Sequence, residues 1–245
     1  GLPFDIHGGG RDLTFPHHEN EIAQSCCSSA DINNPNSYAN YWMHNGFVTV
    51  DGEKMSKSLG NIILVKDLAE DFDGEVIRLA LLSSHYRQGL DWNEQIAHQS
   101  KKLLDKLYNI LLELSDITSD PNESLPDEVR DSLFDDLNTP SAITYLNKIA
   151  KDYKNITDDQ KCSFKSKLLL ISSLLGILQS DPLKWFKFDN DSSGIDSEQV
   201  EKLIAERMIA KEVKDFEKAD QIRNELDAMG VILKDSNSGS EWTLK

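Results

Sequence analysis

The chain has few cysteines, and they do not form a disulfide pattern. Only three of its 245 residues are cysteine: Cys26, Cys27 and Cys162. Such an odd and sparse set is typical of proteins from a reducing compartment, whereas small secreted domains carry even sets of cysteines. We therefore expect a cytoplasmic protein.

The chain also lacks a long apolar run. The longest candidate, residues 168–178, is interrupted by Ser172, Ser173 and Gly176, and it is shorter than the ~18 apolar residues that a membrane-spanning helix requires. Residues 1–5 (GLPFD) contain neither a basic region nor an apolar stretch, so they do not resemble a secretory signal. We expect no association with a membrane.

Basic residues are fewer than acidic ones. The chain has 26 Lys and Arg against 42 Asp and Glu, which gives a formal net charge of −16. Non-specific nucleic-acid binding depends on Lys and Arg that neutralise phosphates, so the composition argues against it. The hydrophobic content of 39% is that of an ordinary globular protein, and the length suits one large domain or two to three small ones.

No methionine begins the chain. Gly1 is followed by a short strand-like stretch, residues 4–7, which continues into three glycines at 8–10. We interpret this start as that of a fragment or a processed product.

The first 62 residues have the pattern of an α/β segment. Residues 4–7 read as a strand, and Pro16 stands where a helix should begin and continue to about Ala30, with Glu19 and Glu21 in its first turn. Residues 46–52 read as a second strand that ends in an Asp-Gly turn.

Helical spacing dominates from residue 73 to residue 180. A short helix is predicted over 73–83, a long one from about residue 94 to 111, and two more over 142–153 and 164–178. Apolar residues recur every three or four positions in each of them, which favours a helical bundle.

The last fifth of the chain is separated by a polar stretch. Residues 186–196 are turn-rich and are the best linker candidate. Apolar residues from Ala205 to Met229 then follow the spacing of one long helix that Gly230 ends, and residues 231–244 read as a closing hairpin.

A lysine-rich pentapeptide, residues 54–58 (KMSKS), is the most informative short motif. Lys54 and Lys57 on a mobile loop can neutralise a triphosphate and the charge that develops on departing pyrophosphate. The alternative for an arbitrary pair of lysines at this spacing is a solvated surface loop. With Leu59-Gly60-Asn61 after it, however, the pentapeptide is the signature loop of class I aminoacyl-tRNA synthetases.

His17 and Glu21 are spaced to share one face of a helix. An imidazole and a carboxylate are half of a four-ligand zinc site, although such a pair can also be a surface hydrogen bond. Cys26 and Cys27 lie ~13–15 Å farther along a helix, which is too far to complete that site. We interpret both cysteines as buried small apolar residues, and the other zinc ligands must come from elsewhere.

Three longer motifs together resemble bacterial cysteinyl-tRNA synthetase. They are residues 5–25 (DIHGGGRDLTFPHHENEIAQS), residues 41–46 (YWMHNG) and the KMSKS loop. Residues 134–140 (FDDLNTP) are similar to the family's helical anticodon-stem domain, and residues 203–223 are similar to its C-terminal anticodon region. The resemblance extends over essentially the whole chain.

The resemblance implies a reaction and a set of roles. In that family ATP, with Mg²⁺ as its expected companion, and L-cysteine form cysteinyl-adenylate, and the cysteinyl group then passes to tRNA(Cys). A zinc ion takes the substrate thiolate as a ligand and so rejects serine, because a soft thiolate binds Zn²⁺ far better than a hydroxyl.

Carried onto this sequence, the family's roles fall on seven residues. Zinc would be bound by His17 and Glu21, the ATP phosphates by Lys54 and Lys57, the cysteine substrate by His7, and the adenylate by Gly10 and Asp12. The alternative for His7 and Asp12 is hydrogen bonding that stabilises the loop.

The resemblance also implies the fold. We expect an α/β remnant of a class I Rossmann-type catalytic domain, then a predominantly α-helical bundle, then a small α+β anticodon-binding region. The expected divisions are the catalytic segment with the KMSKS loop, a stem-contact connection, the anticodon-stem bundle, the linker and the anticodon-binding region, at 1–62, 63–95, 96–185, 186–196 and 197–245.

Compared with the family, the N-terminal half of the catalytic domain is missing. Its HIGH loop and two zinc cysteines do not occur in the sequence, so we expect this chain alone to be an inactive, monomeric piece of a cysteine–tRNA ligase. The alternatives are a ligase that joins cysteine to an amino sugar and a non-catalytic tRNA-binding fragment. The tail argues against the first, because such a ligase needs no tRNA-reading region.

Contacts with tRNA are predicted in two places. Arg223 and Trp242 have the chemistry to hydrogen-bond and stack with anticodon bases. Between residues 148 and 167, six lysines exceed three aspartates, although a solvated helix face accounts for most such lysines.

Overall fold

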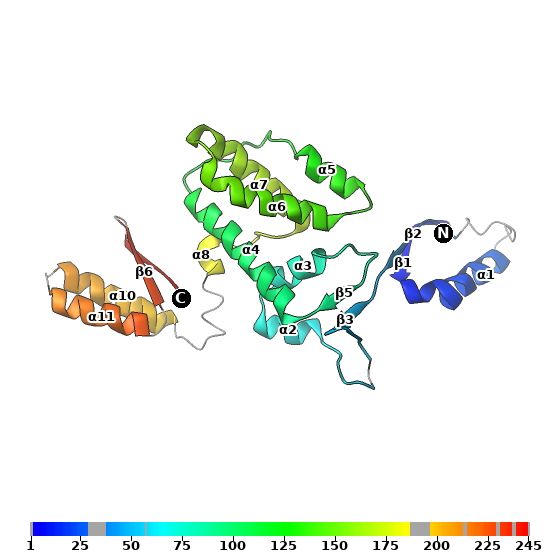
Figure 1. Ribbon diagram of the computed structural model, residues 1–245, viewed down its shortest axis with the longest axis horizontal. Coiled ribbons are helices and arrows are strands. Elements are labelled where there is room, and N and C mark those ends of the chain that lie inside the picture. Colours follow the sequence, from blue (N-terminus) through cyan, green and yellow to red (C-terminus); the bar gives the residue numbers. More distant parts are fainter. Residues whose placement is uncertain are drawn as a thin grey trace.

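The computed structural model describes residues 2–28, 38–56, 58–186, 197–212, 215–228, 231–236 and 239–244. Three parts follow one another along its long axis (Figure 1). A small α/β part with α1, β1 and β2 lies at one end, a larger helical part is central, and a helical hairpin with a β-hairpin lies at the other end. The predicted order of an α/β part, a helical bundle and an α+β tail is confirmed.

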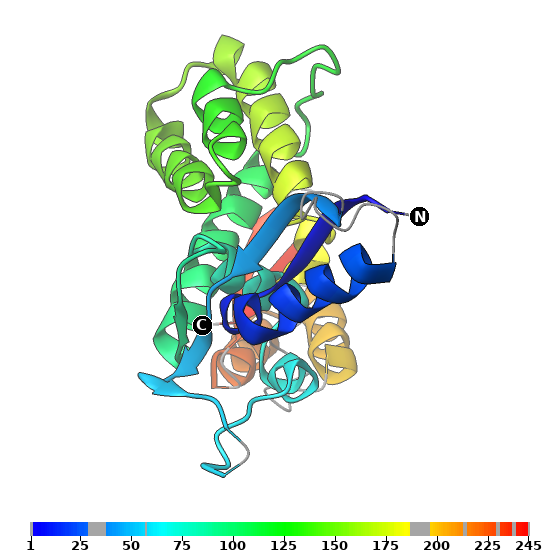
Figure 2. The same ribbon diagram turned by 90° about the vertical axis from the view of Figure 1, so that its right-hand side faces the viewer.

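The N-terminal part is a parallel strand pair joined by a helix. Strand β1 (Phe4–Gly10) runs parallel to β2 (Ala39–Asn45), with Gly10 opposite Asn45. Parallel strands need a crossover connection, and α1 (Glu19–Ser28) lies in that connection beside the strands (Figure 2). The strand predicted at 4–7 is confirmed and is three residues longer.

The predicted helix start at Pro16 is wrong by three residues. A 3₁₀ turn (Arg11–Leu13) and a π-helical turn (Thr14–His18) come before α1. Phe15 has extended backbone angles, φ −138° and ψ 134°, inside this segment. The regular α-helix therefore begins only at Glu19, and His17 lies in the turn that precedes it.

A second sheet carries the lysine loop. Its strand order is β4 (Glu53–Lys54), β3 (Val48–Val50) and β5 (Leu90–Trp92), with β3 antiparallel to β4 and parallel to β5. Asp51 and Gly52 join β3 to β4 with φ angles of +49° and +81°, which are the left-handed values that an Asp-Gly hairpin turn requires. The predicted strand with its turn is confirmed, whereas β5 was not predicted.

Seven helices make up the described central part. They are α2 (Val65–Asp71), α3 (Gly74–Leu82), α4 (Glu94–Glu113), α5 (Asp127–Phe134), α6 (Thr139–Asp152), α7 (Lys161–Leu175) and α8 (Pro182–Trp185). Asp73 and Asn93 cap α3 and α4, since their side chains accept hydrogen bonds from Glu75 N and Ile96 N.

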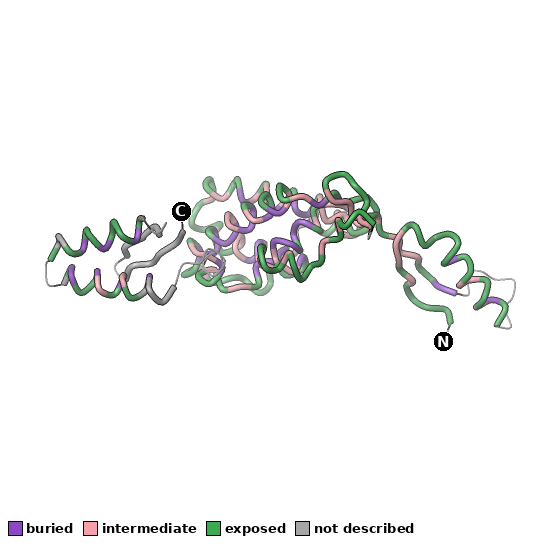
Figure 3. Tube along the Cα trace, turned by 90° about the horizontal axis from the view of Figure 1, so that it is seen from below, coloured by how far each residue is buried: buried purple, intermediate pink, exposed green. Residues whose placement is uncertain are grey.

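The core of the molecule lies between these helices. Leu104 and Leu107 of α4, Leu146 of α6 and Leu168 of α7 are completely buried, and buried residues concentrate along the facing sides of the central helices (Figure 3). The four predicted helices are thus confirmed as the frame of a bundle, to which α5 adds a helix that the sequence reading missed.

The C-terminal part corrects one prediction. Instead of one long helix, α10 (Ser197–Glu212) and α11 (Phe216–Ala228) pack against each other. Ile204 on α10 and Leu226 on α11 are both buried. A single straight helix would leave its apolar stripe in water, whereas a helical hairpin buries two such stripes together.

The remaining predictions concern the tail hairpin, the linker and the cysteines. Strands β6 (Val231–Ser236) and β7 (Gly239–Leu244) form the predicted antiparallel hairpin, while residues 187–196 of the predicted linker and Gly230 lie outside the described residues. Cys26 is buried as expected, but Cys27 is exposed, so its prediction was wrong. In the described part of the chain, no helix is long and apolar enough to cross a membrane.

Candidate active site and metal centre

Strands β1 and β2 bring a cluster of histidines and aromatic rings together. The parallel register sets His7 opposite Trp42 and Gly9 opposite His44. The rings of His7 and Trp42 lie 4.9 Å apart, and Tyr38 stacks on Trp42 at 5.5 Å. The pairing of β1 with β2 therefore brings together side chains that are more than 30 residues apart in sequence.

His18 is the buried centre of this cluster. Only 3% of its surface is exposed, and its Nδ1 lies 2.9 Å from Nε2 of His44, within hydrogen-bond distance. Burial, reinforced by His44 and His7, lowers the pKa of His18. The ring is therefore neutral at neutral pH, and neutral imidazole is the form that binds metal ions.

Glu21 projects from α1 between two histidines. Its Oε2 lies 3.0 Å from His7 Nε2, and its Oε1 lies 3.6 Å from His17 Nε2. Oε2 is nevertheless buried without a well-directed hydrogen bond from any described residue. A buried carboxylate oxygen that accepts no well-directed hydrogen bond is a costly arrangement, and a bound cation would satisfy it.

Three side chains lie close enough to share one metal ion. Ligand atoms of His7, His18 and Glu21 all fall within 4.8 Å of one another. His17 is not one of these three, but its Nε2 lies 3.6 Å from Oε1 of the same carboxylate, so Glu21 is common to the predicted pair and to this cluster. His18 and His44 were missed as site residues; the adjacent His17-His18 pair was the available signal, but only the sheet register places His44 beside it.

The glycine segment packs tightly around these groups. A Cβ on Gly9 would lie 2.9 Å from Cε1 of His18, and a Cβ on Gly10 would collide with the carboxylate of Asp12. The two glycines therefore let the backbone approach His18 and Asp12 more closely than any other residue could. Beside them, a hollow of about 250 Å³ is lined by Arg11, Thr14, His44 and Arg87, which gives it a cationic wall.

Side-chain acceptors bind the hairpin that leads into the lysine loop and one described residue of the loop itself. Asp91 Oδ1 accepts from Thr49 Oγ1 at 2.6 Å and from Gly52 N at 2.7 Å, and these two bonds lower the pKa of Asp91. Ser56 N donates to Asn61 Oδ1 at 2.9 Å, which closes the loop after Lys54.

The two lysines of the motif differ in what the structure describes. Lys54 Nζ lies 4.5 Å from the centre of the ring of Phe47, the residue before β3, in a cation–π contact, whereas Lys57 lies outside the described residues. The loop belongs to the β4-β3-β5 sheet and the histidine cluster to the β1-β2 sheet. The structure thus brings His7, His17 and Glu21 together but carries Lys54 on a separate sheet.

The two predicted tRNA-contacting residues lie in the C-terminal part. Arg223 is exposed on α11, one residue beyond buried Ile222. Trp242 lies in β7 opposite Leu233. Both therefore remain predictions.

Comparisons with known proteins cover most of the chain in three blocks. The model of the catalytic domain of class I (C) tRNA synthetases matches residues 1–102, the DALR domain matches residues 128–179, and the cysteinyl-tRNA ligase anticodon-binding domain matches residues 197–242. The chain belongs to the cysteinyl-tRNA synthetase family.

Individual relatives agree with this family assignment. The cysteine–tRNA ligases of Parvibaculum lavamentivorans and Caulobacter vibrioides are each 48% identical to the chain, over 99% and 100% of its length. They are longer proteins, of which 51% and 52% is matched, so the chain spans about half the length of these curated relatives.

A solved structure supports the class I fold. The LeuRS of Agrobacterium radiobacter K84, in a ternary complex with tRNA and LeuAMS, superposes with a TM-score of 0.55 over 79% of this chain and 28% of its own, at 16% identity. This similarity concerns the fold. It agrees with a class I catalytic-domain remnant followed by a helical region.

Proposed function

We propose that the chain provides part of the active site and the tRNA-binding region of an enzyme that activates L-cysteine with ATP and transfers it to tRNA(Cys). The observation that carries the proposal is that catalytic, helical and anticodon-binding blocks follow in one chain, with a histidine–carboxylate cluster in the first of them. The anticodon-binding match disfavours an amino-sugar ligase, which has no use for that block.

The residues present fit a zinc ion. Glu21 supplies a buried oxygen that accepts no well-directed hydrogen bond from a described residue, and the imidazoles of His7 and His17 lie 3.0 and 3.6 Å from the oxygens of its carboxylate. We assign His17 and Glu21 as two ligands, with two cysteines outside these 245 residues as the others expected from the family. When bound, zinc would prefer a thiolate over a hydroxyl and thereby select cysteine over serine.

The other side chains bind and orient the substrates. His7, fixed between Trp42 and the Glu21 carboxylate, is placed to lie over the bound cysteine. The backbone at Gly10 allows the adenylate to approach, with Asp12 as an acceptor for ribose hydroxyls. Lys54 and Lys57 neutralise the phosphates of ATP, which Mg²⁺ accompanies, as charge moves onto the departing pyrophosphate.

The anticodon region completes the proposed activity. Arg223 and Trp242 are proposed to contact unpaired anticodon bases, because single-stranded bases are recognised by stacking and by hydrogen bonds to their edges. The enzyme would act as a monomer.

A fusion experiment tests the proposal. The part of the Parvibaculum lavamentivorans ligase that this chain does not match is joined to the 245 residues, and cysteine-dependent exchange of pyrophosphate into ATP is measured. We expect exchange by the fusion, no exchange by the 245-residue chain alone, and a loss of at least ~100-fold in Lys54→Ala or Lys57→Ala variants, since each lysine stabilises developing charge.

The matched control is Lys66→Ala, which removes one positive charge from the neighbouring helix α2. It should leave exchange unchanged. Exchange with serine but not cysteine, or full activity of both motif variants, contradicts the proposal.

A further inference from the structure

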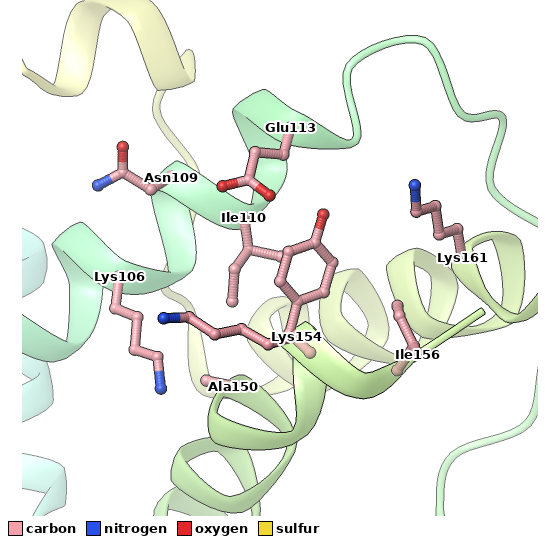
Figure 4. A pocket seen from close by; sticks show the side chains of 9 residues that line it. Lys106, Asn109, Ile110, Glu113, Ala150, Lys154, Ile156 and Lys161 are labelled. Carbon is pink, nitrogen blue, oxygen red and sulfur yellow. The ribbon is translucent and has the colours of Figure 1, made fainter. Parts of the chain in front are cut away.

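A hollow on the central helices is lined by lysines. It has a volume of about 420 Å³ and lies between α4, the end of α6 with the 3₁₀ turn Tyr153–Asn155, and the start of α7. Lys106, Lys154 and Lys161 line it, and Figure 4 shows the Lys154 side chain extending toward the Lys106 side chain. The hollow is far along the chain from the histidine cluster and has no part in it.

The structure separates the lysines of this region into paired and unpaired groups. Lys148 pairs with Glu128, Lys161 with Asp158 and Lys167 with Glu123, while Lys165 donates to the backbone oxygens of Leu114 and Ile117. Within the described residues, Lys106, Lys151 and Lys154 have no such partner. The solvated or structural interpretation therefore holds for the first group, and of the three remaining lysines it is Lys106 and Lys154 that line the hollow.

Lys106, which is half-buried, and Lys154, which is exposed, both place positive charge on the wall of the hollow. Lys106 is half-buried, and burial together with Lys151 and Lys154 lowers its pKa, against the opposite influence of Asp152. Two ammonium groups held close together repel each other unless an anion lies between them. The chain as a whole carries a net charge of −16, so this local excess is not a consequence of composition.

The remaining walls suit a phosphodiester. Ile110, Ala150 and Ile156 supply an apolar surface, and Asn109 adds an amide. The wall also carries the carboxylate of Glu113. Burial, and after it a hydrogen bond with Glu113, raises the pKa of the Tyr153 hydroxyl. Glu113 thus has its own partner in Tyr153.

We propose that Lys106 and Lys154 bind a backbone phosphate of the tRNA on the face formed by α4, α6 and the start of α7. The proposal rests on the proposed function, which makes tRNA the nucleic acid at hand. Lysine is a flexible point charge that binds phosphate without reading sequence, so this site would add affinity and register but no base specificity. A strongly acidic protein can bind RNA in this way, through a few local contacts.

Salt-dependent binding of the 245-residue chain to a tRNA(Cys) transcript tests the site. Fluorescence anisotropy is measured for the unmodified chain, for the double variant K106Q/K154Q, and for a matched control, K148Q/K167Q, which loses the same charge from paired lysines. Each phosphate contact contributes about 3.5-fold to the loss of affinity between ~50 and ~200 mM salt. Because both lysines contact the same phosphate, we expect K106Q/K154Q to lose about 3.5-fold less affinity over this range than the unmodified chain, and to bind more weakly at low salt.

Two further measurements make the outcome decisive. The single variant K154Q, at an exposed position, should show about half of the change in salt slope, so that a folding defect of the double variant is not mistaken for lost contacts. Inorganic phosphate is titrated against the same variants by NMR, and equal effects of the mutations on phosphate and tRNA support the site.

Three results would overturn the proposal. If K106Q/K154Q behaves like K148Q/K167Q while the unmodified chain binds tRNA, the lysine site is wrong and the proposed function stands. If the mutations abolish phosphate binding only, the hollow is a free-anion site. If the unmodified chain binds no tRNA, both the lysine site and the tRNA part of the proposed function fail.

Discussion

Replacing Glu75 should weaken the attachment of helix α3 to the segment that follows α7. Its carboxylate accepts hydrogen bonds from the hydroxyl of Tyr108 at 2.9 and 3.0 Å, and from the backbone N–H groups of Leu178, Gln179 and Ser180 at 2.6, 2.8 and 3.3 Å. One side chain of α3 therefore ties together α4 and the segment that leads into α8.

The magnitude follows from the donors that lose their acceptor. A hydrogen bond to a charged group contributes ~1.5–3 kcal/mol, and a buried donor left without a partner costs ~1–3 kcal/mol. Glu75→Ala removes an acceptor from four donors. Water can reach part of this half-buried segment and replace some of the lost hydrogen bonds. We expect the free energy of unfolding of the central part to fall by about 4 kcal/mol. Tyr108→Phe removes the hydroxyl that donates to Glu75 and accepts from Ser180 N at 3.1 Å, but leaves the Glu75 carboxylate in place, and should cost about 1–2 kcal/mol.

Differential scanning calorimetry of the full chain measures the effect. About 4 kcal/mol corresponds to a fall in Tm of ~8–16 °C for a protein of this size. Glu70→Ala, on the exposed face of α2, is the control and should change the free energy of unfolding by less than ~0.5 kcal/mol. A Glu75→Ala protein that melts within ~2 °C of the unmodified chain would refute the reasoning.

Three other predictions concern single positions. Gly176 has φ +67°, and a Cβ there would lie 2.7 Å from Nε of Arg78, so Gly176→Ala should lower the free energy of unfolding by ~2–3 kcal/mol. Gly60→Ala is the control and should cost ~1 kcal/mol, because a Cβ on Gly60 meets open space. Equal losses of the two variants in urea unfolding would contradict this prediction. Hydrogen bonds from Arg87 and Tyr86 lower the pKa of Asp136 to about 2, below the ~3.9 of an unfolded chain. The stability lost in Asp136→Asn should therefore be present above pH ~4 and disappear as the pH falls towards 2, and a loss that stays constant in acid denaturation series would count against it. In the fused protein, His17→Ala should lower zinc content measured by mass spectrometry and His18→Ala should not; the reverse result assigns the metal to the compact cluster instead.

Several parts of this molecule are determined by short stretches of sequence. The Asp51-Gly52 turn, the Asp73 cap and the apolar spacing from Ile96 to Leu111 each specify their own backbone, because turns, caps and helical faces depend on residues within one or two turns of each other. The sequence also predicted the order of the three parts and the family resemblance, because both depend on motifs made of residues that are close together in the chain.

Other features were decided only by the tertiary structure. Sequence spacing could not show that His44 lies 2.9 Å from His18, that Asp91 binds the turn before the lysine loop, or that the helix predicted from Ala205 to Met229 is a packed hairpin. Each of these depends on which distant surfaces meet, and burial free energy rather than local propensity selects that arrangement. The lysines make the same point: residues 148–167 carry six of them, and only the fold brings Lys154 to the hollow that Lys106 of α4 also lines.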